Sequence, residues 1–269
     1  VNNPETLAHV ALIARYGAGW FRELGTATQP GSMLVTLWGP VAHQGVYEIE
    51  AGAPVTSLID AAGGLTANVR AVLVGGYAGG WVDGRELSAL ALSDEQLAPF
   101  GARVGAGVVA LLPDDGCGLA ESSRVLHWLA HESAGQCGPC VHGLAAIDSA
   151  MTEIVDGVAA QGQPRRLAHL LSIVRGRGAC SHPDGTVTFA QSALEVFAQE
   201  VDDHARRGPC ERCANSTTLP VPEVRGSITS RAARSNGQGR RQGRTAQGRT
   251  AQGRNAQGRT APGRERLRT

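Results

Sequence analysis

The sequence predicts an α+β protein in which a small mixed module precedes an all-α helical bundle. Short apolar runs separated by glycine-rich turns occupy the first part of the chain, and amphipathic helical patterns with short loops follow them. A chain of 269 residues with 42% hydrophobic content is long enough for about two domains with a real core.

The mixed module is expected to follow a first helix. Asn3 is a suitable cap for this helix and Pro4 a suitable first residue. The helix is expected to end at Trp20 and Phe21, before Gly25. Strands are expected over residues 33–38, 45–49, 70–74 and the run after Gly105, with a short helix over 55–62. Strands and a helix mixed in this way indicate a small α+β module.

Four helices with short loops are expected after this module, over residues 120–132, 141–158, 164–174 and 189–205. Leu167, Leu171 and Val174 recur at helical spacing and form one face of the third helix. Four short-looped helices of this kind indicate an all-α bundle. The cysteines fall in its loops and at its helix starts.

The formal net charge of +1 averages two oppositely charged segments. From Arg225 onward the chain has 12 arginines against one acid, whereas residues 1–224 have 13 arginines against 23 acids. From Gly243 the tail repeats units such as GRTAQ and has almost nothing apolar to bury, so it is expected to be disordered. Contact of the tail with nucleic acid is not expected, because it has no aromatic side chains to stack on bases.

The chain shows no signal for insertion into a membrane or for secretion. No run of about 18 apolar residues occurs, so no membrane-spanning helix is predicted. No charged and then apolar leader opens the sequence. We therefore expect a cytoplasmic protein with reduced thiols, which could lie at the inner face of a membrane through a complex.

The six cysteines carry the strongest chemical signal, because two CxxC pairs occur among them. Cys137 and Cys140 lie in a Gly/Pro turn at a helix start, where backbone N–H groups favour negative charge. Thiolates that hold an anionic iron–sulfur cluster need such donors. Cys180, in the loop before the last helix, could complete the site from across the bundle, and Cys210 and Cys213 form the second pair.

Three other uses of the cysteines stay open. Cys137-Gly-Pro-Cys140 has the letters of the thioredoxin redox motif, but a helical pattern rather than a βαβ strand leads into it. The two pairs, Cys137/Cys140 and Cys210/Cys213, could hold zinc, although the stretch between them is far longer than in a zinc ribbon. The thiols could also be inert buried groups.

Three separated blocks of the sequence resemble the NADH-binding flavoprotein (the F subunit) of respiratory complex I, the NADH-quinone oxidoreductase, and the related flavoproteins of NAD-linked hydrogenases and formate dehydrogenases. The blocks are VNNPET at 1–6, the module over 39–80, and ESAGQCGPC at 132–140 followed by Cys180. The resemblance covers about residues 1–206, the C-terminal part of that flavoprotein.

The resemblance implies four regions. Residues 1–30 would be a helix left from the flavin-binding region, and 31–112 a β-grasp domain of the SLBB type. Residues 113–208 would be a four-helix domain that binds one [4Fe–4S] cluster. Residues 209–269 would hold the second CxxC pair and the disordered basic tail.

The resemblance assigns the cluster ligands to Cys137, Cys140 and Cys180. The family's motif is Ser-Cys-Gly-x-Cys-x-x-Cys with a fourth cysteine further along the chain, and its first cysteine position is Ala134 here. Three cysteines could hold a three-iron cluster, or a [4Fe–4S] cluster that another ligand completes.

A [4Fe–4S] cluster at this site therefore needs a further donor from elsewhere. Cys210 or Cys213, from the second CxxC pair, is the expected fourth ligand. His142 and Cys117 are weaker choices.

The resemblance gives flavin contacts to Asn2, Asn3 and Thr6 only. In the family, the glycine-rich region that binds NADH and FMN precedes this segment, and no GxGxxG turn on a strand occurs in the chain. Asn3 and Thr6 flank a helix N-terminus that suits a phosphate, and ordinary capping explains the same residues equally well. The chain alone is not expected to oxidise NADH.

The sequence therefore predicts an electron-transfer subunit, or a fragment of one, whose cluster takes electrons from NADH and FMN. Its partners would be other redox subunits of an NADH dehydrogenase-like complex that reduces quinone or another acceptor. Whether the chain is itself an oxidoreductase stays open, and no catalytic side chain is predicted. The alternatives are a non-catalytic partner-binding module with a structural metal site, and a truncated, inactive product.

Overall fold

The computed structural model describes residues 2–158 and 162–222. These residues belong to one compact unit, Val1–Val224. The predicted disorder of the arginine-rich repeat concerns residues outside the described range. The domain boundaries expected near residues 30, 112 and 208 stay predictions.

Helix α1 (Pro4–Phe21) opens the chain, over the residues that the sequence predicts. The Oδ1 atom of Asn3 accepts a hydrogen bond from the backbone N–H of Thr6 at 2.8 Å, which caps the helix. Gly17 has a φ of 90° and interrupts the helical backbone near its end, which a residue with a side chain would rarely do. None of the residues of α1 is buried.

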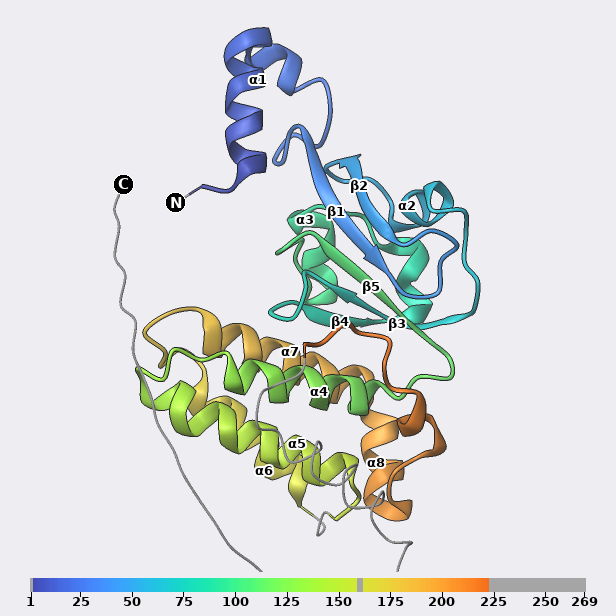
Figure 1. Cartoon of the computed structure of the whole chain (residues 1–269), viewed down its shortest axis with the longest axis vertical. Coiled ribbons are helices and arrows are strands. Elements are labelled where there is room, and N and C mark those ends of the chain that lie inside the picture. Colours follow the sequence, from blue (N-terminus) through green and yellow to red (C-terminus); the bar gives the residue numbers. More distant parts are fainter. Residues whose placement is uncertain (1, 159–161, 223–269) are drawn as a thin grey trace, which may run out of the picture. The chain divides into compact units, whose positions relative to one another are not determined.

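A five-stranded sheet follows, with strand order β2-β1-β5-β3-β4 (Figure 1). The strands are β1 (Ser32–Trp38), β2 (Gly45–Glu50), β3 (Val69–Val74), β4 (Gly80–Asp83) and β5 (Val108–Pro113). β1 and β5 pair in parallel, and the other neighbours pair antiparallel. The helices α2 (Val55–Ala61) and α3 (Asp94–Leu97) and the 3-10 turns η1 (Gly84–Ala89) and η2 (Ala98–Phe100) complete the module.

The central strands of this sheet are buried on both faces. On β3, Val72 and Val74 join the core that includes α2, whereas Ala71 and Leu73 join the core formed with the helices of the second half. Strand β5 alternates between the same two cores. Successive side chains of a strand point to opposite faces, so the sheet separates two apolar cores.

The second half of the chain is helical, as the sequence predicts. Its elements are α4 (Gly118–His131), the π-helical turn η3 (Pro139–Leu144), α5 (Ala145–Val155), α6 (Gln163–Val174), α7 (His182–Val196), α8 (Ala198–Arg207) and the 3-10 turn η4 (Glu211–Asn215). Helix α7 packs on β4, and α4 packs on α5 and α7. The mixed α+β fold class is confirmed by this arrangement.

The structure contains elements that the sequence did not predict, and one predicted helix is divided. Strand β4 was not expected, because its four residues lie within a glycine-rich stretch that carries little strand pattern. The helix predicted over 189–205 is two helices, α7 and α8, which part at Phe197. The apolar spacing runs on through Phe197, whose buried ring lies against Gly118, so the sequence pattern does not reveal the break.

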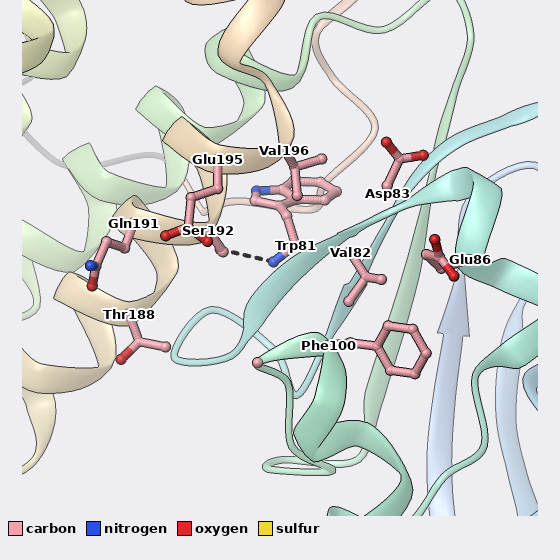
Figure 2. Close-up of a pocket in the computed structure, with 11 residues that line it drawn as sticks. Trp81, Val82, Asp83, Glu86, Phe100, Thr188, Gln191, Ser192, Glu195 and Val196 are labelled. Carbon is pink, nitrogen blue, oxygen red and sulfur yellow. Dashed lines mark hydrogen bonds between the residues drawn. The ribbon is translucent and has the colours of Figure 1, made fainter.

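Trp81 of β4 joins the sheet to the helices (Figure 2). The residue is 2% exposed, and its indole Nε1 donates to Ser122 Oγ on α4 at 3.0 Å. Its backbone N–H donates to Ser192 Oγ on α7 at 2.9 Å. The indole ring lies 5.3 Å from the ring of Phe197 and 6.3 Å from that of Phe189. Trp81 therefore connects the sheet to α4 and α7 through packing and hydrogen bonds.

Replacing Trp81 with Ala is expected to lower the free energy of unfolding by about 3–5 kcal/mol, because a buried ring is lost and a cavity is left. The matched control is Trp20→Ala, since Trp20 is 40% exposed. A change within about 0.5 kcal/mol is expected for this control. Urea denaturation followed by circular dichroism measures both values, and equal losses would contradict the role of Trp81.

Candidate metal centres

The first group of cysteines lies beyond the end of helix α4. Cys137 precedes the π-helical turn η3 and Cys140 lies within it, whereas Cys180 lies in the loop between α6 and α7. Cys140 is close enough to Cys137 and Cys180 for both to affect its pKa. The three cysteines that the resemblance implies as ligands thus approach one another from two segments.

The surroundings of these thiols differ. Hydrogen bonding with the backbone of Ala179, and then of Cys140, lowers the pKa of the Cys137 thiol below its ordinary value. Burial raises the pKa of Cys140, and the neighbouring Cys137 and Cys180 raise it further. Cys180 is exposed. Hydrogen-bond donors aimed at a sulfur are what a metal-bound thiolate needs.

The spread of these three cysteines differs from that of ligands on a single ion. In the described ranges, two groups of three or more metal-ligating residues have all their ligand atoms within 4.8 Å of one another, and neither contains Cys137, Cys140 or Cys180. A cluster with several irons distributes its cysteines over different metal atoms. The three thiols are therefore not arranged around a single ion, and three cysteines are a donor set that iron–sulfur clusters use.

The position of the family's first cysteine offers no ligand in this chain. Ala134 is exposed, in the loop that leads from α4 to η3. His142, a weaker choice for the fourth ligand, is exposed on η3. The fourth ligand stays a prediction.

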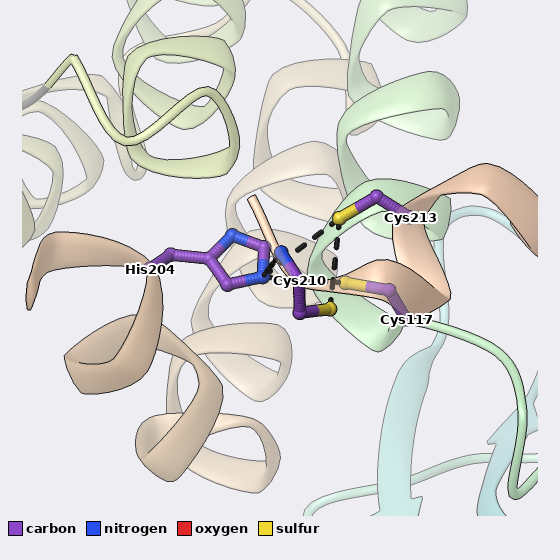
Figure 3. Close-up of side chains that lie close together, drawn as sticks. All are labelled: Cys117, His204, Cys210 and Cys213. Carbon is purple, nitrogen blue, oxygen red and sulfur yellow. Dashed lines mark hydrogen bonds between the residues drawn. The ribbon is translucent and has the colours of Figure 1, made fainter. Parts of the chain in front are cut away.

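The second group consists of Cys117, His204, Cys210 and Cys213 (Figure 3). Cys117 caps the start of α4, His204 lies in the last turn of α8, and the two other cysteines belong to the segment that follows α8. The Cys210 and Cys213 sulfurs are 3.7 Å apart, and His204 Nε2 is 3.8 Å from the sulfurs of Cys117 and Cys213. The four ligand atoms thus lie close enough to one another to bind a single metal ion.

Burial shapes the acidity of this second group. It raises the pKa of Cys117 and of Cys213. Burial also acts to raise the pKa of Cys210, but hydrogen bonds with His204, Cys213 and Cys117 outweigh it and lower this pKa to about 7. The group therefore contains one thiol that ionises near neutral pH beside two that do not.

The structure gathers Cys210 and Cys213 with Cys117 and His204, and each group lies near one end of α4. Helix α4 has 14 residues and so is about 21 Å long, at 1.5 Å per residue. His204 was not predicted as a ligand from the sequence. A histidine shortly before a CxxC pair, at the end of an amphipathic helix, is the signal that could have found it.

The proposed flavin contacts have a local role. Asn2, Asn3 and Thr6 are described at the start of the chain, and Asn3 together with the Thr6 N–H forms the cap of α1. Capping therefore accounts for two of the three residues. Their assignment to FMN stays a prediction.

A pocket of about 320 Å³ lies between the sheet and α7 (Figure 2). Asp83, Glu86 and Glu195 line it beside apolar groups such as Phe100. Three carboxylates disfavour the phosphates of a dinucleotide, so this pocket is not a candidate for NADH. In the described ranges, no helix is both long and apolar enough to cross a membrane.

Two family models match separate parts of the chain. The SLBB domain matches residues 34–87, and the NADH-ubiquinone oxidoreductase-F iron–sulfur binding region matches residues 120–204. The second match contains Cys137, Cys140 and Cys180. The predicted SLBB and iron–sulfur domains are thus confirmed.

Curated relatives show the same relationship. The chain is 30% identical over 213 residues to the F 2 subunit of the NADH-quinone oxidoreductase of Rhizobium meliloti (strain 1021), a match that covers 78% of this chain and 50% of the relative. It is 28% identical to the HndC subunit of the NADP-reducing hydrogenase of Solidesulfovibrio fructosivorans, over 82% of this chain and 46% of that one. The chain spans about half the length of these relatives.

A solved structure is similar as well. A chain of the NAD+-reducing [NiFe]-hydrogenase in the H2-reduced state matches with a TM-score of 0.70 and 27% identity, over 90% of this chain and 39% of that one. The α+β arrangement thus occurs in a larger redox protein.

In metal-free protein, alkylation of Cys137 is expected to become fast at a lower pH than alkylation of Cys140. The thiolate is the reactive form, and the pKa of Cys137 is lowered whereas that of Cys140 is raised. Iodoacetamide labelling between about pH 6 and pH 8, below the ordinary thiol pKa of about 8.5, followed by tandem mass spectrometry, measures the order. In denaturant the two rates should converge, and an order that persists there would contradict the structural cause.

Proposed function

Because the chain carries an SLBB domain and the iron–sulfur-binding region of the NADH-ubiquinone oxidoreductase F subunit, we propose that it transfers electrons within an NADH dehydrogenase-like complex. One observation supports this most directly. Within that region Cys137, Cys140 and Cys180 approach one another from two segments, with backbone N–H donors beside the first of them. The proposal makes these cysteines the ligands of an iron–sulfur cluster.

The residues around the three cysteines suit this role. A [4Fe–4S] cluster bound there supplies one-electron oxidation and reduction. The backbone of Ala179 and of Cys140 lowers the pKa of Cys137, which stabilises its thiolate. Gly135, with a φ of 63°, and Pro139, at the start of η3, shape the turn that presents the sulfurs.

The fourth ligand of the proposed cluster comes from outside the second group of cysteines. Cys210 and Cys213 lie with Cys117, at the start of α4, whereas Cys137 lies beyond the end of this helix. A helix about 21 Å long separates the two places, so a bond from Cys210 or Cys213 to the cluster would need α8 and its following segment to unpack. A three-iron cluster needs no fourth ligand, and a [4Fe–4S] cluster could take a fourth ligand that is not a cysteine of this chain. Neither arrangement requires α8 to unpack.

The exposure of Cys180 fits transfer of electrons to or from another protein. Cys140 is buried and Cys180 is exposed, so the site lies at the edge of the helical domain. We expect the partners to be other redox subunits, at the cytoplasmic side of the membrane, with NADH and FMN as the electron source and quinone or another acceptor downstream.

A partner-binding module with a structural metal site is the second candidate function. The compact group of Cys117, His204, Cys210 and Cys213 favours it, because this group can hold a metal without any electron transfer. In that case the SLBB domain would bind a partner, and Cys137, Cys140 and Cys180 would carry no iron.

Anaerobic reconstitution of the full chain with iron and sulfide is expected to give a brown protein with about three or four irons per chain. Replacing Cys137 and Cys140 with Ser should lower the iron content about tenfold or more, because two ligands are lost. Iron and sulfide analysis measures this content. EPR spectra separate the two cluster types, since a three-iron cluster is paramagnetic when oxidised and a [4Fe–4S] cluster when reduced.

The matched control replaces the other CxxC pair, Cys210 and Cys213, with Ser. Iron content and the EPR spectrum should then stay unchanged if neither residue is the fourth ligand. A colourless protein without an EPR signal after reconstitution would contradict the redox proposal and favour the partner-binding module.

A further inference from the structure

We propose that Cys117, His204, Cys210 and Cys213 bind one zinc ion, which fastens the segment after α8 to the start of α4 (Figure 3). This site is separate from the proposed iron–sulfur ligands and does not depend on them. The distances between the ligand atoms, their chemistry and their burial support one bound ion.

The distances match a tetrahedral site with a single ion. Zinc binds sulfur at about 2.3 Å and histidine nitrogen at about 2.0 Å, so the ligand atoms of a tetrahedron lie about 3.5–3.8 Å apart. The Cys210 and Cys213 sulfurs are 3.7 Å apart, and His204 Nε2 is 3.8 Å from the sulfurs of Cys117 and Cys213. All four ligand atoms lie within 4.8 Å of one another, which leaves room for one ion and not for a cluster of irons.

The chemistry of the donors favours zinc. Three thiols and one imidazole form the Cys₃His set of structural zinc sites, whereas calcium and magnesium prefer oxygen ligands. His204 Nε2 accepts the backbone N–H of Cys210 at 3.4 Å, so this nitrogen carries no proton, as a zinc ligand requires, and zinc would replace this hydrogen bond. The backbone N–H of Ala120 donates to the Cys117 sulfur at 3.4 Å, as expected around a metal-bound thiolate.

One carboxylate lies beside the set but is already engaged. Glu200 forms an ion pair with Arg70, and its Oε2 accepts the thiol of Cys117 at 3.2 Å and the backbone N–H of Leu119 at 3.4 Å. Zinc binding would displace the thiol proton of Cys117, because the thiolate is the ligand. The positive charge of Arg70 balances Glu200, so the carboxylate does not oppose the thiolates unpaired.

The position of the group explains what the ion would do. Cys117 and His204 are fully buried, and they stand 87 residues apart in the chain. The segment after η4 then lies along α4 and β1: Glu121 accepts the backbone N–H groups of Thr218 and Leu219, and Trp38 Nε1 donates to Thr218 O at 2.6 Å. An ion at the start of this segment would hold it in place.

Metal analysis of the full chain, purified without chelators and without reconstitution, tests the proposal. One zinc per chain is expected. Replacing Cys210 and Cys213 with Ser should lower zinc at least tenfold, whereas replacing the other CxxC pair, Cys137 and Cys140, should leave it unchanged. His204→Ala should lose zinc, and His204→Cys should keep it, since four thiolates also bind zinc.

A second measurement serves if the Ser variants do not fold. Stripped wild-type protein is titrated with Co²⁺, and the intense visible absorption of tetrahedral cobalt with a thiolate charge-transfer band should reach its limit at one equivalent. Zinc should abolish this spectrum. A chain without zinc that gives only weak, octahedral cobalt bands would overturn the proposal. So would a disulfide between Cys210 and Cys213 in freshly purified protein, or zinc lost with Cys137 and Cys140.

Discussion

Burial of the sheet on both faces is the constraint on which the rest of this structure depends. Residues of β3 and β5 alternate between the core that includes α2 and the core formed with the second-half helices. A sheet that is apolar on both faces needs cover on both, because exposed apolar area costs about 25 cal/mol per Å². Helices α4 and α7 provide the second cover, and Trp81 connects them to the sheet.

The placement of α4 follows from that contact and, in turn, positions both groups of cysteines. Cys117 caps the start of α4, and the turn with Cys137 and Cys140 follows its end. One rigid helix thus keeps the proposed zinc site and the proposed iron–sulfur ligands apart. The two sites differ in exposure as well: a buried site suits a structural ion, and a site at the domain edge suits electron transfer.

Much of the fold follows from sequence patterns, and the exceptions have physical causes. The apolar run of β3 and the face of α6 that contains Leu167 and Leu171 are local patterns. Each predicted its strand or helix correctly. Strand β4 was missed because pairing with β3, rather than its own residues, makes Gly80–Asp83 a strand. The break at Phe197 was missed because the apolar spacing continues through it, and its ring packs against Gly118, which is far away in the sequence.

The sequence by itself determined the local elements and the short-range pairing of each CxxC, because such features depend on neighbouring residues, and its resemblance to a known family indicated the SLBB and iron–sulfur domains. Only the tertiary structure decided which cysteines meet. Cys117 and His204 are brought together across 87 residues by the packing of α8 on α4, and no local pattern encodes such a contact. For the same reason the sequence suggested that Cys210 and Cys213 share a metal site with Cys137 and Cys140. The fold instead gathers Cys210 and Cys213 at the opposite end of α4.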